Sequence, residues 1–151
     1  MAAGFTIETE KIGPFQEALE AYARKNIVDE LLIRTLAVDL ELPLALATEK
    51  LCSAISILEP FGIGNPAPTF VTRNLKLFDA RLVGKEGKHL KLRVVPDDGG
   101  YPVDAIAFGL GSRLGELEKS KNFDMAYSLE LNEWNGKRSV QLKVKDIEIP
   151  S

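Results

Sequence analysis

The sequence predicts an α+β protein in which a small barrel of five strands follows a partial α/β segment and a connecting helix. Apolar residues recur at helical spacing early in the chain, whereas apolar and polar residues alternate after residue 70. Between these parts, residues 58–70 contain three prolines and two glycines, which fits neither a helix nor a central strand. Because this segment lacks Ser-rich and Gly-rich repeats, we expect a stiff connector.

The part before the connector predicts a β-α-β-α order. Residues 2–8 form a short strand candidate, and apolar spacing from Phe15 onward predicts an amphipathic helix. Residues 36–42 alternate as in a strand, which a proline then ends. Thr48 is placed to cap a second helix, which ends at Glu59 because the residue before a proline avoids the α region. This order is too short for a complete α/β domain and indicates the end of one.

Five strand candidates and one short helix follow the connector. In the first strand, the apolar residues fall on odd positions up to Leu77 and on even positions from Phe78 to Ala80 and beyond. This change in the alternation predicts a bulge or a sharp bend. Asn135-Gly136 predicts a tight hairpin between the last two strands. A bent first strand and a helix between the third and fourth strands are typical of an OB-fold, a barrel that often binds single-stranded nucleic acid. The strands are expected at 71–83, 89–95, 103–108, 123–131 and 139–147, and the helix at 111–119.

These elements divide the chain into three parts. We expect an α/β remnant at 1–45, a helix with the connector at 46–68, and the OB-fold at 69–151. The formal net charge of −3 argues against a general nucleic-acid binder. Residues 1–69 carry a net charge of −5 and residues 70–151 one of +2, so a basic surface on the barrel requires that its cations gather on one face.

The composition excludes several kinds of site. A single cysteine, Cys52, excludes an internal disulfide framework and indicates a reducing compartment; with a single histidine it also excludes a Cys/His zinc site. No apolar run approaches the ~20 residues that span a membrane. Asp97-Asp98 resembles a metal-binding carboxylate pair, but a proline before it and two glycines after it predict a solvated turn. No nucleophile–base or two-metal arrangement can be assembled, so we expect no catalytic and no metal-binding residue here.

Basic side chains on two strands are the candidates for DNA binding. His89, Lys91 and Arg93 share one face of the second strand, next to the surface that OB-folds use for oligonucleotides. A solvated strand face explains this stripe equally well. Trp134 in the last hairpin is able to stack on a base, and the other interpretation, which we favour slightly, is an anchor that closes the barrel end. The expected DNA-binding residues are Lys88, His89, Lys91, Arg93, Trp134, Lys137, Arg138, Gln141, Lys143 and Lys145.

Several segments resemble the RecJ-type single-strand-specific exonucleases in order and spacing. The connector is similar to the sequence that joins the last two parts of that family. Other segments resemble its second and third OB strands, its closing hairpin, and the stretch after the Gly-Gly-His motif of its DHH-associated domain. In that order, the segments are 58–70, 87–92, 104–109, 132–136 with 141–147, and 2–6.

The resemblance implies a C-terminal fragment, made of the end of the DHH-associated domain and the OB-fold. The parent is expected to degrade single-stranded DNA from the 5′ end in recombination and repair. Its missing DHH domain would hold manganese or magnesium with clustered Asp and His residues. The fragment itself is then expected to need no cofactor, to lack nuclease activity and to bind single-stranded DNA in the cytoplasm, away from membranes.

Further expected partners are a single-strand-binding protein or a helicase. The alternative is a structural or protein-docking OB domain, with the DNA gripped mainly by the catalytic domains. The low net charge favours this alternative, whereas the lysines and arginines of the second and fifth strands favour DNA binding.

Overall fold

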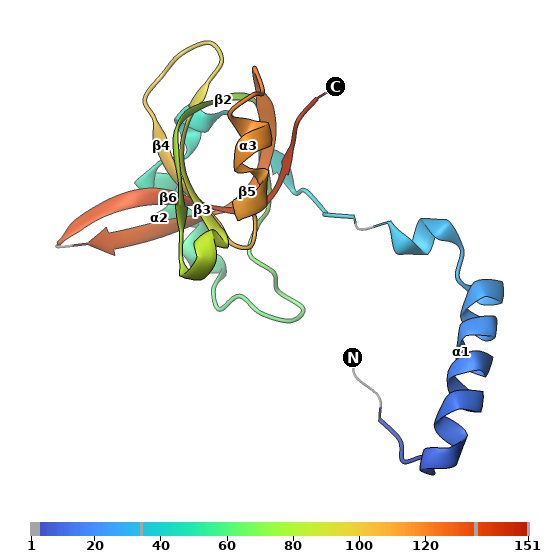
Figure 1. Ribbon diagram of the computed structural model, residues 1–151. Helices are drawn as coiled ribbons and strands as arrows, with labels where there is room; N and C mark the ends of the chain where they lie inside the picture. The colour runs from blue at the N-terminus through green and yellow to red at the C-terminus, as the bar shows by residue number, and fades with distance from the viewer. Residues whose placement is uncertain (1–3, 34, 135, 151) are drawn as a thin grey trace. The chain divides into compact units, whose positions relative to one another are not determined.

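The computed structural model describes residues 4–33, 35–134 and 136–150, without the side chains of Asp29, Glu30, Trp134 and Lys137. The chain forms two compact units, residues 1–36 and residues 37–151 (Figure 1). Each unit has its own elements and is considered by itself.

The first unit is helical in its described residues. Helix α1, Ile12–Asn26, follows a 3-10 turn at Thr9–Lys11 and precedes another at Asp29–Leu32. The strand predicted at 2–8 is wrong for residues 4–8, which form no strand. A short strand is stable only where it pairs with another, and the described residues of this unit offer no second strand.

The second unit contains the barrel. Its strands are β2 (Phe70–Val83), β3 (His89–Pro96), β4 (Val103–Ala107), β5 (Phe123–Trp134) and β6 (Lys137–Glu148). The strand order is β2-β3-β4-β6-β5, and β2 also pairs with β5, which closes the sheet on itself (Figure 1). Helix α3, Leu114–Leu117, lies between β4 and β5 in the chain and buries Leu117 completely. This arrangement confirms the predicted OB-fold.

The start of the second unit belongs with the barrel. The strand predicted at 36–42 shrinks to β1, Leu40–Glu41, which runs parallel to the start of β2. A 3-10 turn at Leu44–Leu46 then places Leu44 and Ala47 in the barrel core. Of the expected β-α-β-α order, the first helix, the second strand and the second helix are present as α1, β1 and α2 (Glu49–Ile55), and only the opening strand is absent from the described residues. The assignment of residues 1–45 to a DHH-associated domain stays a prediction.

Helix α2, Glu49–Ile55, begins as predicted. Thr48 adopts an extended conformation, and its hydroxyl accepts a 3.2 Å hydrogen bond from the N–H of Leu51. A 3-10 turn at Ser56–Leu58 continues the helix to the connector. Within the connector, the side chain of Asn65 donates to the carbonyl oxygens of Leu58 and Pro60, both at 2.9 Å. These bonds fix the turn, which confirms a shaped connector.

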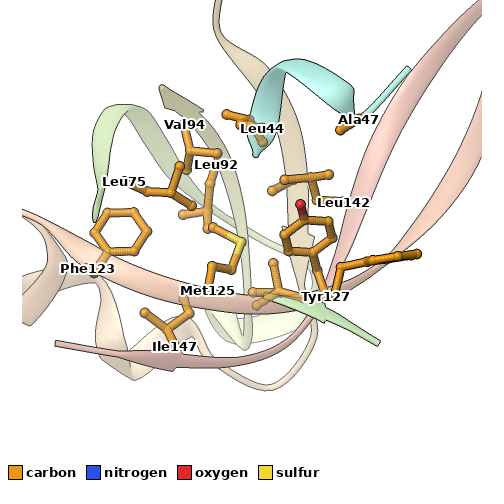
Figure 2. Close-up of a cluster of buried hydrophobic side chains, with 14 of the residues drawn as sticks. Leu44, Ala47, Leu75, Leu92, Val94, Phe123, Met125, Tyr127, Leu142 and Ile147 are labelled. Atoms are coloured by element: carbon orange, nitrogen blue, oxygen red, sulfur yellow. The ribbon is translucent and has the colours of Figure 1, made fainter. Parts of the chain in front are cut away.

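The core consists of side chains that alternate inward along the barrel strands. Figure 2 shows Leu44 and Ala47 at one end of this cluster and Ile147 at the other. The fully buried members include Leu75, Leu90, Leu92, Val94, Phe123, Met125, Tyr127 and Leu142. The predicted irregularity of the first barrel strand is confirmed as a register shift between Leu77 and Asp79. Phe78, which the apolar phase placed with Ala80, instead lies exposed at this bulge.

Candidate nucleic-acid interface

Strand β3 separates its side chains as the sequence predicted. Leu90, Leu92 and Val94 are fully buried, whereas His89, Lys91 and Arg93 lie on the outer face and are partly or fully accessible. In the barrel, β3 and β4 form the centre of the surface that OB-folds use for oligonucleotides. The predicted stripe is therefore real, and its position fits a binding role.

The strand register extends this stripe into a row across the sheet. Arg81 of β2 pairs with Lys91 of β3, Lys91 pairs with Ile106 of β4, and Ile106 pairs with Lys143 of β6. Paired residues in a sheet point to the same face, and neighbouring strands are ~4.8 Å apart. We call Arg81, Lys91 and Lys143 the basic row. Arg81 was missed from the sequence, because only the strand register shows that it pairs with Lys91.

A second row, which contains carboxylates, lies beside the basic row. The Arg93 Nε lies 3.8 Å from Asp104 Oδ1, and the Lys143 Nζ lies 2.8 Å from Glu130 Oε1. These exposed pairs add little stability, but they reduce the positive potential of the face. Gln141, a predicted site residue, lies in this row between two carboxylates. Its members, in order across the strands, are Asp79, Arg93, Asp104, Gln141 and Glu130.

Two exposed phenylalanines contact the outer side chains of β3. The guanidinium carbon of Arg93 lies 4.8 Å from the ring centroid of Phe78. The imidazole of His89 meets the ring of Phe108 edge-on, with the centroids 5.2 Å apart. Neither phenylalanine was predicted as a site residue from the sequence, since an apolar residue in or beside a strand is first assigned to the core. Only the strand register shows that each ring is exposed and lies next to a side chain of β3.

The loop before β3 is held against the end of β4. The N–H of Gly109 donates to His89 Nδ1 at 3.0 Å, and the N–H of Gly111 donates to the Lys88 carbonyl oxygen at 3.0 Å. The first bond makes Nδ1 the acceptor, so in the neutral imidazole Nε2 carries the proton. The Lys88 Nζ lies 3.2 Å from Glu86 Oε2, and both side chains are exposed. The loop therefore places two predicted site residues at one end of β3.

The remaining predicted residues lie elsewhere. The ammonium of Lys145 donates to Thr69 Oγ1 at 2.6 Å and to the Ala67 carbonyl oxygen at 3.3 Å, so it holds the connector and does not extend the basic row. A bulge in β6, opposite Ala126 and Tyr127 of β5, interrupts the regular alternation of side chains between Lys143 and Lys145. Arg138 pairs with Glu133 in the exposed hairpin at 3.2 Å. The side chains of Trp134 and Lys137 lie outside the described residues.

The surroundings of two other titratable groups, Cys52 and Asp97, shift their pKa values. Cys52 is buried as predicted, and burial raises the pKa of its thiol. Asp97 lies in the predicted turn, where its hydrogen bond with Lys76 lowers its pKa. Among the described residues, no group of three or more His, Cys, Asp or Glu side chains is placed to hold a metal ion. Within the same ranges, no helix is both long and apolar enough to cross a membrane.

Comparison with known proteins identifies the barrel. A family model described as the RecJ OB domain matches residues 38–146. The chain belongs to this family. It is 34% identical over 148 residues to the single-stranded-DNA-specific exonuclease RecJ of Haemophilus influenzae, covering 98% of this chain and 26% of that protein. The same-named protein of Escherichia coli is 31% identical over 147 residues, with 97% and 25% covered.

A solved structure agrees with the sequence comparison. The crystal structure of RecJ from Thermus thermophilus in complex with Mn2+ has a TM-score of 0.74 and 28% identity, over 98% of this chain and 20% of that one. The RecJ-type resemblance and the OB-fold are thus confirmed. The chain spans about a quarter of the length of the curated RecJ relatives it matches.

Proposed function

We propose that residues 37–151 are a single-stranded-DNA-binding module of a RecJ-type exonuclease that acts in DNA recombination and repair. The observation that carries this proposal is the register that aligns Arg81, Lys91 and Lys143 on the oligonucleotide-binding side of an OB-fold. Membership of the RecJ OB domain family and the names of the relatives support it.

The basic row suits phosphate binding of moderate strength. Its three cations are spread over four neighbouring strands, about 14 Å from first to last at ~4.8 Å per strand. Three phosphate contacts on a single strand correspond to a salt slope of about −2, at ~0.7 per contact. The positive charge of Lys143 is partly offset by Glu130, so binding at physiological salt is expected to be weak.

Hydrolysis belongs, in this proposal, to the rest of a longer protein. The described residues offer no group suited to a divalent ion, so no step through manganese or magnesium is assigned to them. A catalytic domain elsewhere in the parent would hold those ions, and this module would hold the strand, in the cytoplasm, alongside a single-strand-binding protein or helicase. Incubation of the chain with labelled single-stranded DNA and manganese is expected to leave the DNA intact. Shortening of the DNA by an activity that co-purifies with the chain would contradict this assignment.

The alternative is a structural or protein-docking domain. It is favoured by the ion pairs that Arg93, Lys143, Lys88 and Arg138 make with neighbouring carboxylates, because each pair lowers the potential that attracts phosphate. Under this alternative, the chain would not bind oligonucleotides even at low salt.

A titration of fluorescent oligothymidine, at two salt concentrations, separates the two functions. The unaltered chain is expected to bind more tightly at the lower salt concentration, with a slope of about −2. The variant Arg81→Ala/Lys91→Ala/Lys143→Ala should lose at least tenfold in affinity, and its slope should approach zero. The control variant, Lys50→Ala/Lys119→Ala/Lys121→Ala, removes the same charge from residues that lie outside the barrel strands. Equal binding by the two variants would refute the proposed interface.

A further inference from the structure

Phe78 owes its position to the bulge in β2. Leu77 packs against the core and Ala80 does so as well, yet Phe78 and Asp79 between them both lie exposed. The register shift between Leu77 and Asp79 allows two consecutive side chains to point outward. Phe78 is 57% exposed, and its ring meets the guanidinium of Arg93, which belongs to the outer face of β3. The bulge therefore delivers an aromatic ring to the basic face.

Phe108 reaches the same face at the other end of β3. It follows the last residue of β4 and is 56% exposed. The turn after it passes through Gly109 at a positive φ of 76°, and the N–H of this glycine holds His89. His89 in turn meets the ring of Phe108 edge-on. The ring is thus placed by a fixed turn and by a side chain that is itself hydrogen-bonded.

Exposure by itself does not distinguish these rings, since Tyr101 in the turn between β3 and β4 is 92% exposed. Single exposed apolar residues are common on protein surfaces. What distinguishes Phe78 and Phe108 is that each contacts an outward side chain of β3, with Lys91 between them. Bases stack on aromatic rings, on histidine and on the guanidinium plane of arginine.

We propose that Phe78 with Arg93 and Phe108 with His89 are two base-stacking platforms, which lie on either side of the basic row. This inference rests on the proposed function. Arg93 and His89 are four residues apart on β3, which corresponds to ~13 Å at ~3.3 Å per residue. At ~3.4 Å per nucleotide of a stacked strand, this distance is about four steps, so a segment of about five nucleotides places one base on each platform. Stacking accepts every base, so the ligand is a short single-stranded segment of any sequence.

The test compares oligothymidine with an abasic oligonucleotide that has the same number of phosphates. The unaltered chain should bind oligothymidine more tightly, and Phe78→Leu or Phe108→Leu should each reduce this preference by about 5- to 150-fold, the equivalent of one stacked base. Leucine keeps the apolar bulk but has no stacking ring, whereas Phe78→Trp should restore or increase binding. The salt slope should stay unchanged in these variants, because no phosphate contact is lost. Tyr101→Leu is the matched control and should bind as the unaltered chain does.

The length dependence gives a second readout. Affinity should rise steeply as the oligothymidine is lengthened to about five nucleotides, and this rise should disappear when either ring is removed. Equal affinity for the thymidine and abasic strands, with no effect of the two leucine variants, would overturn the stacking platforms and leave the basic row intact. Failure to bind either strand at low salt would overturn the proposed function, and the platforms with it.

Discussion

Two buried hydroxyl groups join the segment before α2 to the barrel. Thr72 Oγ1 lies 2.6 Å from the Leu42 carbonyl oxygen and 2.7 Å from the hydroxyl of Tyr127. A carbonyl oxygen only accepts, so the single hydroxyl proton of Thr72 is donated to Leu42, and Tyr127 must then donate to Thr72. The geometry thus fixes the direction of both bonds.

This direction makes the two hydroxyl deletions unequal. Thr72→Val leaves the Leu42 carbonyl and the Tyr127 hydroxyl without partners, and at ~1–3 kcal/mol for each buried group the free energy of unfolding should fall by ~2–6 kcal/mol. Tyr127→Phe removes one donor but leaves the bond from Thr72 to Leu42, so its cost should be ~0.5–1.5 kcal/mol. The double variant should cost less than the sum, because the orphaned tyrosine hydroxyl is no longer present.

Urea unfolding of the full chain, followed by far-ultraviolet circular dichroism, measures these differences. Thr35→Val is the matched control, since Thr35 is exposed, and should change the free energy of unfolding by less than ~0.5 kcal/mol. The reasoning would be refuted if Thr72→Val cost no more than Tyr127→Phe, or if the two costs simply added. Either result would mean that residues 40–42 do not pack on the barrel as the structure shows.

Three further changes test separate parts of the structure. Gly111→Ala places a Cβ against the carbonyl oxygen of Gly87 in the loop before β3, so urea melts should show a loss of ~1–3 kcal/mol in the free energy of unfolding. Gly115→Ala, whose Cβ meets nothing within 4 Å, is its control and should be neutral or slightly stabilising. Thr48→Ala removes the hydrogen bond that caps α2 and should lower the free energy of unfolding by ~1 kcal/mol; an unchanged melt would exclude a stabilising cap. Burial raises the pKa of Tyr127, so the unfolded state loses this proton first as the pH rises past ~10. Stability should therefore fall above that pH and not below it, and Tyr127→Phe should show a smaller fall in melts at increasing pH.

The sequence by itself determined the barrel elements. Strict alternation in residues 89–95 separates buried leucines from outward cations, and the structure places them in that way. The cap at Thr48, the hairpin after β5 and the irregularity near Phe78 were also visible, because each depends on a few neighbouring residues. Local backbone preference and side-chain period are properties of short segments, so a single sequence is enough to reveal them.

Only the tertiary structure decided which distant residues meet. The strand register aligned Arg81, Lys91 and Lys143. The bulges turned Phe78 outward and Lys145 toward the connector. The two residues of β1 form a strand because they pair with β2. The strand expected at 2–8 was wrong in its described part for the same reason, since a strand exists only with a partner. Pairing register depends on contacts between segments far apart in the chain, and no local pattern contains that information.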